Sequence, residues 1–151
     1  MENFMQQLWI VLATLAGGCI ALQAAANSSL RSALQDARYA AFFSIVGTMV
    51  TATVLMLALR PPLPAATALK GTPWWNWIGG PLGAIFVLSG ASLVPKLGAA
   101  AFIASVVAGQ LAFSLFLDHF GLMHLPQQSI TPGRLFGVLL VFAGVMAVKY
   151  L

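Results

Sequence analysis

The sequence predicts an all-α integral membrane protein that crosses the bilayer with five helices per chain. Of its 151 residues, 60% are hydrophobic and only 7% are charged, and the mean hydropathy is +0.94. An ordinary soluble domain is about 25% charged, so the few charged side chains here would not cover a soluble surface. The outer surface of the fold therefore faces lipid.

Five runs without charged residues are long enough, or nearly long enough, to cross a bilayer. They predict helices over about residues 8–28, 39–59, 74–94, 97–117 and 134–150. A spanning helix needs roughly 20 apolar residues, and the first four runs meet this directly. The last run is shorter, but the long side chains of Arg134 and Lys149 at its ends can extend to the headgroups. We expect residues 1–151 to form a single transmembrane domain.

The predicted helices are joined by segments rich in charge and proline. The first connection has three charged residues, the second has four prolines, and the fourth has both histidines and two more prolines. Only Pro95 and Lys96 separate the third and fourth helices, which predicts a tight antiparallel hairpin. Pro81 follows two glycines inside the third helix and predicts a kink there. The tryptophans at 74–77 are typical of an aromatic belt at a membrane surface.

The positive charges predict no fixed orientation in the membrane. Lys and Arg residues in short loops set the orientation of a helical membrane protein. One side of the bilayer receives Arg60, Lys70 and Arg134, and the other receives Arg31, Arg38, Lys96 and Lys149. Three against four is almost balanced, which favours insertion in both directions. Two copies of opposite orientation would then form an antiparallel homodimer, equivalent to an inverted repeat.

The predicted helix interiors contain amides and hydroxyls but no ionisable side chain. A cation exporter driven by protons normally needs a membrane-embedded carboxylate, which is absent here. Amides and hydroxyls bind a polar solute without titrating, although they equally serve as hydrogen bonds between helices. The candidate substrate-binding residues are Gln23, Asn27, Ser44, Gly83, Ser105 and Gln110.

Small residues on the last helix predict a contact between two chains. Gly137 and Gly144 are seven residues apart and therefore share one helix face, which allows another helix to approach closely. Packing within the same chain is the alternative interpretation of this face.

Several other functional classes are disfavoured. The net charge of +4 is spread over loops, unlike the clustered basic face of a nucleic-acid-binding protein. Asp118, His119 and His124 match no common metal-ligand spacing, and we interpret them as a solvated helix end. The single cysteine, Cys19, excludes an intrachain disulfide. We expect no metal, no cofactor and no enzymatic activity, because no nucleophile, base or paired carboxylates share one membrane depth.

Four segments carry a resemblance to a known family: ALQAAANSSL, GGPLGAIFVLSGASLVPKLGAAAF, AGQLAFSLFLDHFGLM and GRLFGVLLVFAGV. Together they resemble the YdcZ-like family of the drug/metabolite transporter superfamily over nearly the whole chain. The positions similar to the family pattern are Gln23, Asn27, Gly47, Gly83, Pro95, Gly98, Gly109, Gln110, Asp118, Gly121, Gly137 and Gly144.

The resemblance implies a bacterial inner-membrane protein of five helices, related to one half of the ten-helix members of the superfamily. The chain is also similar to the four-helix small multidrug resistance proteins, which pair antiparallel and share the spacing of Gly137 and Gly144. Those relatives rely on a glutamate in the first helix, where this chain has only Gln23 and Asn27. Exchange of a cation for a proton is therefore not implied.

The sequence thus predicts a transporter that exports a small organic solute by alternating access, acting as a dual-topology dimer. The alternatives are a small dual-topology channel and a non-transporting subunit that docks on another membrane protein.

Overall fold

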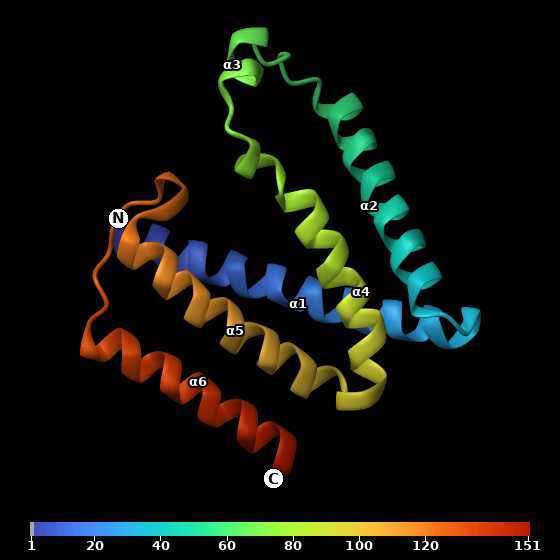
Figure 1. Cartoon of the computed structure of the whole chain (residues 1–151), viewed down its shortest axis with the longest axis vertical. Coiled ribbons are helices and arrows are strands. Elements are labelled where there is room, and N and C mark those ends of the chain that lie inside the picture. Colours follow the sequence, from blue (N-terminus) through green and yellow to red (C-terminus); the bar gives the residue numbers. More distant parts are fainter. Residues whose placement is uncertain (1) are drawn as a thin grey trace. The chain divides into compact units, whose positions relative to one another are not determined.

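The computed structural model describes residues 2–151, with side chains described from residue 4 onward. Its secondary structure within that range is helical throughout, as predicted (Figure 1). The elements are α1 (Glu2–Leu34), α2 (Ala37–Leu59), α3 (Ala66–Gly71), η1 (Trp74–Trp77), α4 (Gly79–Leu97), α5 (Ala99–Phe120), η2 (Leu122–His124) and α6 (Pro132–Tyr150). Five helical segments in the described part are long and apolar enough to cross a membrane, which confirms the predicted number of spans.

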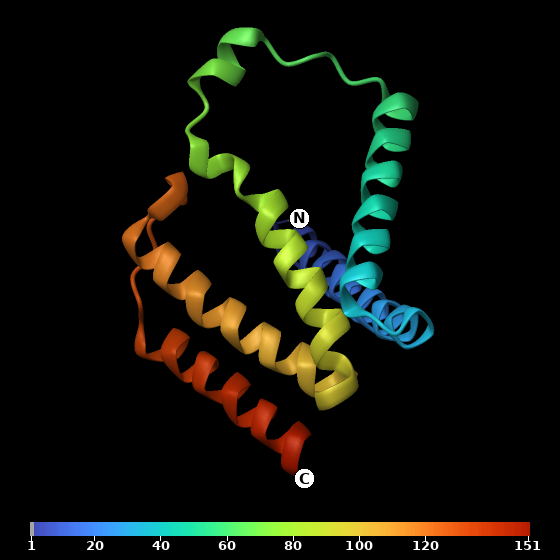
Figure 2. The same cartoon turned by 45° about the vertical axis from the view of Figure 1, so that its right-hand side comes forward.

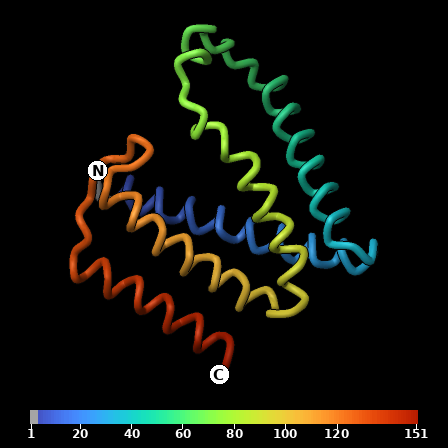
Figure 3. Tube along the Cα trace, in the orientation of Figure 1, coloured from blue at the N-terminus to red at the C-terminus, as the bar shows by residue number. Residues whose placement is uncertain are grey.

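The chain divides into two compact units, and the division falls inside two of the long helices. One unit consists of residues 1–24 and 93–151, and the other consists of residues 25–92. The first unit contains α5 and α6, with the beginning of α1 and the end of α4. The second contains α2, α3 and η1, with the end of α1 and most of α4, and its trace can be followed in Figure 3.

Helices α5 and α6 form an antiparallel pair within the first unit (Figures 1 and 2). The buried residues of these two helices are Ala101, Phe102, Ala108 and Leu115 of α5 and Val138 of α6. Most large apolar side chains of both helices remain exposed, including Phe113 at 63% and Phe136 at 61%. An exposed surface of this kind suits lipid rather than water as the surrounding solvent.

The connection between α5 and α6 is held by hydrogen bonds to the end of α5. The backbone N–H of Gln128 donates to the Asp118 carbonyl at 2.8 Å, and the Gln127 side-chain amide donates to the His119 carbonyl at 2.9 Å. The backbone N–H of Ile130 donates to Nδ1 of His119 at 3.3 Å. The first two bonds satisfy carbonyls that a helix end otherwise leaves without partners.

An ion pair closes the same connection. Arg134 of α6 donates from Nη2 to the carboxylate of Asp118, and from Nη1 to the Gln128 carbonyl at 3.0 Å. The Thr131 hydroxyl accepts from the Arg134 backbone N–H at 3.2 Å and caps α6. The sequence interpretation of Asp118 as part of a solvated helix end therefore missed its main role, which is to tie α5 to α6.

Gly121 makes the turn out of α5 and offers a matched test of the connection. Its φ of +58° lies in the left-handed region, and an added Cβ would be 3.4 Å from Cβ of Gln127. We expect Gly121→Ala to lower the free energy of unfolding by about 1 kcal/mol. Gly109→Ala, in the helical part of α5 with open space around it, is expected to raise it by about 0.5 kcal/mol. Thermal unfolding in detergent measures both, and equal effects would contradict the turn geometry.

A short break at Gln35 and Asp36 separates α1 from α2. Gln35 has a φ of +57°, and the Asp36 carboxylate caps α2 by accepting from the Arg38 backbone N–H at 2.8 Å. The same carboxylate forms an ion pair with the Arg38 guanidinium at 2.7 Å. The side-chain hydrogen bond from Arg38 holds the pKa of the Asp36 carboxyl below its usual value.

The bends before and after α4 do not lie at the residues where the sequence predicted them. Because α4 begins at Gly79, Pro81 lies in its first turn, where a proline costs the helix no hydrogen bond. The break that we expected inside a helix is therefore the junction between η1 and α4, at Ile78. Pro95 lies inside α4, and the turn into α5 is made by Gly98 with a φ of +84°.

Candidate solute-binding site

Asn27 is the one buried polar side chain among the residues whose side chains the structure describes, with 6% of its surface exposed. The other buried side chains of residues 25–92 are those of Ala40, Ala41 and Ala91, which are all small. In that part of the chain the buried interior is therefore a layer of small side chains with a single amide in it. An amide offers two donated hydrogen bonds and an acceptor oxygen.

The amide of Asn27 makes no hydrogen bond with any other described residue. No side-chain nitrogen or oxygen in the described part is fully enclosed and without a partner. The amide atoms of Asn27 therefore stay within reach of a small molecule. An amide without a hydrogen-bond partner inside a membrane protein costs free energy, so its presence calls for a reason other than stability.

Gln23 lies one turn before Asn27 in α1 and so shares its helix face. Its side chain is half-buried and, like that of Asn27, forms no hydrogen bond within the described residues. Gln23 belongs to the unit that contains residues 1–24, whereas Asn27 belongs to residues 25–92. Each amide can by itself donate to and accept from a polar solute.

The predicted serines differ in availability. The Ser105 hydroxyl donates to the Ala101 carbonyl of its own helix at 2.8 Å, and Ser89 does the same to Ile85. A hydroxyl bonded to its own helix has less to offer a ligand. The Ser44 side chain in α2 is half-buried and makes no such bond, which leaves it free.

The remaining predicted binding residues lie on exposed helix surfaces. Gln110 of α5 is exposed and has no hydrogen-bond partner among the described residues. Gly83 of α4 is also exposed, and a Cβ added to it would meet nothing within 4 Å. Asn27, Ser44 and Gly83 belong to residues 25–92, whereas Gln23, Ser105 and Gln110 belong to the other unit. No hydrogen bond joins members of either group.

The two glycines predicted to contact a second chain leave open space on α6. Gly137 is half-buried and Gly144 is exposed, and neither has an atom within 4 Å of an added Cβ. Helix α6 packs on α5 through a neighbouring face that includes Val138 and Arg134. Packing within the described chain therefore leaves the face of Gly137 and Gly144 uncovered.

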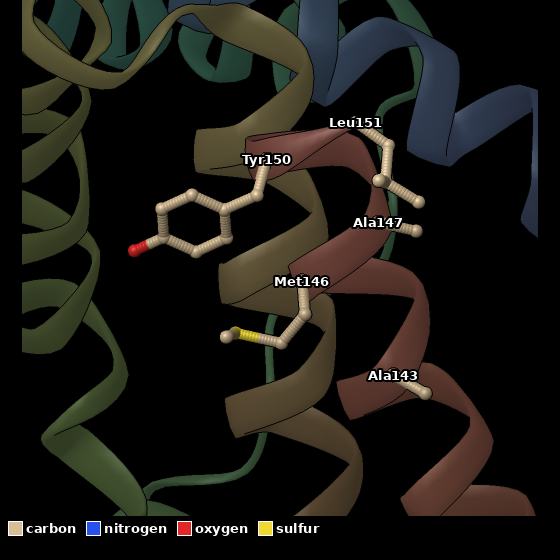
Figure 4. Close-up of a pocket in the computed structure, with 5 residues that line it drawn as sticks. All are labelled: Ala143, Met146, Ala147, Tyr150 and Leu151. Carbon is tan, nitrogen blue, oxygen red and sulfur yellow. The ribbon is translucent and has the colours of Figure 1, made fainter.

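A hollow near the end of α6 was missed by the sequence analysis. Figure 4 shows its lining residues, Ala143, Met146, Ala147, Tyr150 and Leu151. All five come from the end of one helix, and the surface they present is almost entirely apolar. No periodicity in the sequence marks such a hollow, and it contains none of the predicted binding residues.

The described groups can bind a polar solute by hydrogen bonds. Among the side chains that the structure describes, no three His, Cys, Asp or Glu residues gather as metal ligands would. The free amides of Gln23 and Asn27 can both donate and accept, so they suit a neutral molecule with both kinds of group. A buried charge would need a partner that these amides do not supply.

Comparison with known proteins identifies one matching family. The model of the family described as "Putative inner membrane exporter, YdcZ" matches residues 8–147. No curated protein and no solved structure matches the chain significantly.

Proposed function

Because the chain belongs to the YdcZ family of inner membrane exporters, we propose that it exports a small neutral organic solute by alternating access. The five apolar helices make it a multi-pass protein of the inner membrane. In the proposed cycle two copies of opposite orientation surround one solute path. The solute binds to amides and hydroxyls of the first four long helices, α1, α2, α4 and α5.

The observation that carries this proposal is the free, buried amide of Asn27. In a membrane protein, a buried polar group without a partner is costly and marks a place where function outweighs stability. Gln23 of α1 and Ser44 of α2 resemble Asn27 in that each has a polar side chain without a hydrogen bond within the described residues, and we propose that they also bind the solute. Gly83, Ser105 and Gln110 complete the proposed set.

The proposed inverted homodimer rests on charge balance and on the glycine face of α6. Of the seven basic residues, Arg38 and Arg134 are engaged in ion pairs with neighbouring carboxylates. The other five divide two against three across the membrane, so the balance persists. We propose that Gly137 and Gly144 receive a helix of the second copy, because a small side chain at each position lets two backbones approach.

Single-site labelling tests the orientation. A cysteine added at the C-terminus, in a Cys19→Ala background, is labelled with an impermeant maleimide in intact cells and in inverted vesicles. We expect about equal labelling from each side of the membrane, because the loop charges are balanced. Labelling from one side alone would rule out the homodimer with two orientations. Shifting the balance by Lys70→Gln and Arg60→Gln should turn the chain toward one orientation and serves as the control.

Export itself is tested by comparing the metabolites outside and inside cells that express the wild-type chain with those of cells that carry an empty vector. We expect one or a few neutral polar metabolites to accumulate in the medium and fall inside the cell. The purified protein in liposomes should then carry the same compound at carrier rates. Flux many orders of magnitude faster would indicate a channel and contradict alternating access, because carrier cycles take μs to s.

A further inference from the structure

A groove between α2 and α4 is lined by none of the proposed solute-binding residues. Both helix segments belong to residues 25–92. One wall comes from α2 and the other from α4, and apart from Arg38 every lining residue is apolar. The lining residues are Arg38, Ala41, Phe42, Ile45, Ala84, Ile85 and Leu88.

Arg38 marks the end of the groove that lies at the membrane surface. It lies in the first turn of α2, next to the break between two spanning helices. From Arg38 to Ile45 the groove follows α2 for about 10 Å, at 1.5 Å per residue. A guanidinium at headgroup level with about 10 Å of apolar wall beneath it matches the two chemical parts of an amphiphile.

The aromatic residues beside Arg38 extend the same surface. A second hollow is lined by Arg38, Tyr39, Phe42 and Phe43, so Arg38 and Phe42 are shared by both. The rings of Phe42 and Phe43 meet edge to face with centroids 5.5 Å apart. Phe42 thus lies between two open apolar hollows that share the Arg38 side chain, an arrangement that fits a molecule with one headgroup and two chains.

The local charge favours a lipid whose headgroup contains an anionic group such as a phosphate diester. The Arg38 guanidinium binds Asp36 through Nε and Nη2, while its Nη1 makes no hydrogen bond within the described residues. Arg31 also acts on the Asp36 carboxylate through its charge. Two cations and one anion leave a net positive charge at the groove end, with free N–H groups that suit phosphate oxygens.

We propose that this groove binds a membrane phospholipid, with its phosphate on the Arg38 guanidinium and its acyl chains along Phe42. One chain lies between α2 and α4, against Ile45 and Ile85. The second chain lies in the hollow lined by Tyr39, Phe42 and Phe43. The bound lipid fills the space between the two helices that the chain itself leaves open.

Native mass spectrometry of the detergent-purified protein tests this assignment. The probe is palmitoyl-oleoyl phosphatidylglycerol, and the readout is the fraction of protein that carries one lipid. Arg38→Gln is expected to lower the apparent affinity about ten-fold, as loss of a charge-assisted hydrogen bond would. Ile85→Trp, which fills the groove, should lower it at least as much. Arg38→Lys keeps the charge and should retain most of the binding.

The matched controls lie on α2 and at its end, away from the groove. Arg60→Gln removes an arginine from the far end of α2, and Val54→Trp adds a bulky side chain on its exposed face. Both should bind lipid as the wild type does. Glycerophosphate, which lacks acyl chains, should not displace the lipid. Wild-type binding by correctly folded Arg38→Gln and Ile85→Trp proteins, or equal loss in the controls, would overturn the proposal.

Discussion

Replacing Asn27 with leucine is expected to stabilise the purified protein and to abolish export. Leucine has a similar volume but no polar atoms, so the cost of a buried amide without a partner disappears. We expect a gain in unfolding free energy of up to about 1 kcal/mol, the low end of the roughly 1–3 kcal/mol for a fully enclosed group, because the Asn27 amide atoms keep some accessible surface. Thermal unfolding in detergent measures the stability, and the metabolite comparison measures export.

A loss of stability in Asn27→Leu would assign Asn27 a structural role instead of a binding role. If Asn27→Leu destabilised the protein, the amide would be bonded to a partner that the single chain lacks, and the residue would hold helices together. Ser105→Ala is the matched control because the Ser105 hydroxyl is already bonded to its own helix. Its effect on stability should stay within about 0.5 kcal/mol, as for a substitution that removes no tertiary contact.

Breaking the ion pair between Asp118 and Arg134 is expected to loosen the connection between α5 and α6. Arg134→Gln removes the ion pair and the hydrogen bond to the Gln128 carbonyl, whereas Asp118→Asn removes the ion pair alone. Both side chains are about 30% exposed, at 31% and 27%, so solvent weakens the pair. We expect losses of about 1–2 kcal/mol for Arg134→Gln and about 0.5–1 kcal/mol for Asp118→Asn.

Hydrogen exchange shows where this loss occurs. Peptides covering residues 119–131 should exchange about five-fold faster in Arg134→Gln, which corresponds to about 1 kcal/mol of local stability. The double variant should lose less than the sum of the single losses, because the two residues act on each other. Asp36→Asn, which breaks the other ion pair, is the control and should leave these peptides unchanged. Strict additivity would show that the pair contributes nothing.

The long helices were predictable because lipid leaves few alternatives to helical structure. With no water to satisfy backbone groups, an uncharged run of sufficient length forms a helix. The same argument identified the 19-residue α6, although its run of apolar residues is short. The short helix α3 was not predicted, since six residues carry too little periodicity to stand out from a proline-rich connection. Residues 74–77 were expected to begin the helix 74–94, whereas the structure gives them as a separate 3-10 helix, η1.

The breaks between helices were harder to place than the helices themselves. Pro95 and Lys96 looked like a turn, yet proline is accommodated near the end of α4 and the turn falls on Gly98. A positive φ is easily adopted by glycine, which makes Gly98 the better signal. Asp118 and Arg134 are sixteen residues apart, and no sequence periodicity links residues across a loop.

The candidate binding residues stay a prediction, but the structure separates them by burial and by hydrogen bonding. The absence of charge inside the helices pointed to amides and hydroxyls, and Asn27 is indeed the buried one. Sequence alone did not separate it from Gln110, which is exposed, or from Ser105, which is bonded to its own helix. Burial depends on which helices pack on which face, and small residues on several faces left that choice open.

The lengths of the first and last helices differ enough to make the protein sensitive to bilayer thickness. Helix α1 has 33 residues and is about 50 Å long, whereas the 19 residues of α6 give about 28 Å. The hydrocarbon core is about 30 Å thick, so α1 must tilt or extend into the headgroups while α6 barely spans it. The predicted apolar span of α1, residues 8–28, is itself only about 32 Å long, so the rest of α1 extends into the headgroups. A thicker bilayer therefore increases the hydrophobic mismatch of the short α6 first, and α6 makes the protein sensitive to bilayer thickness.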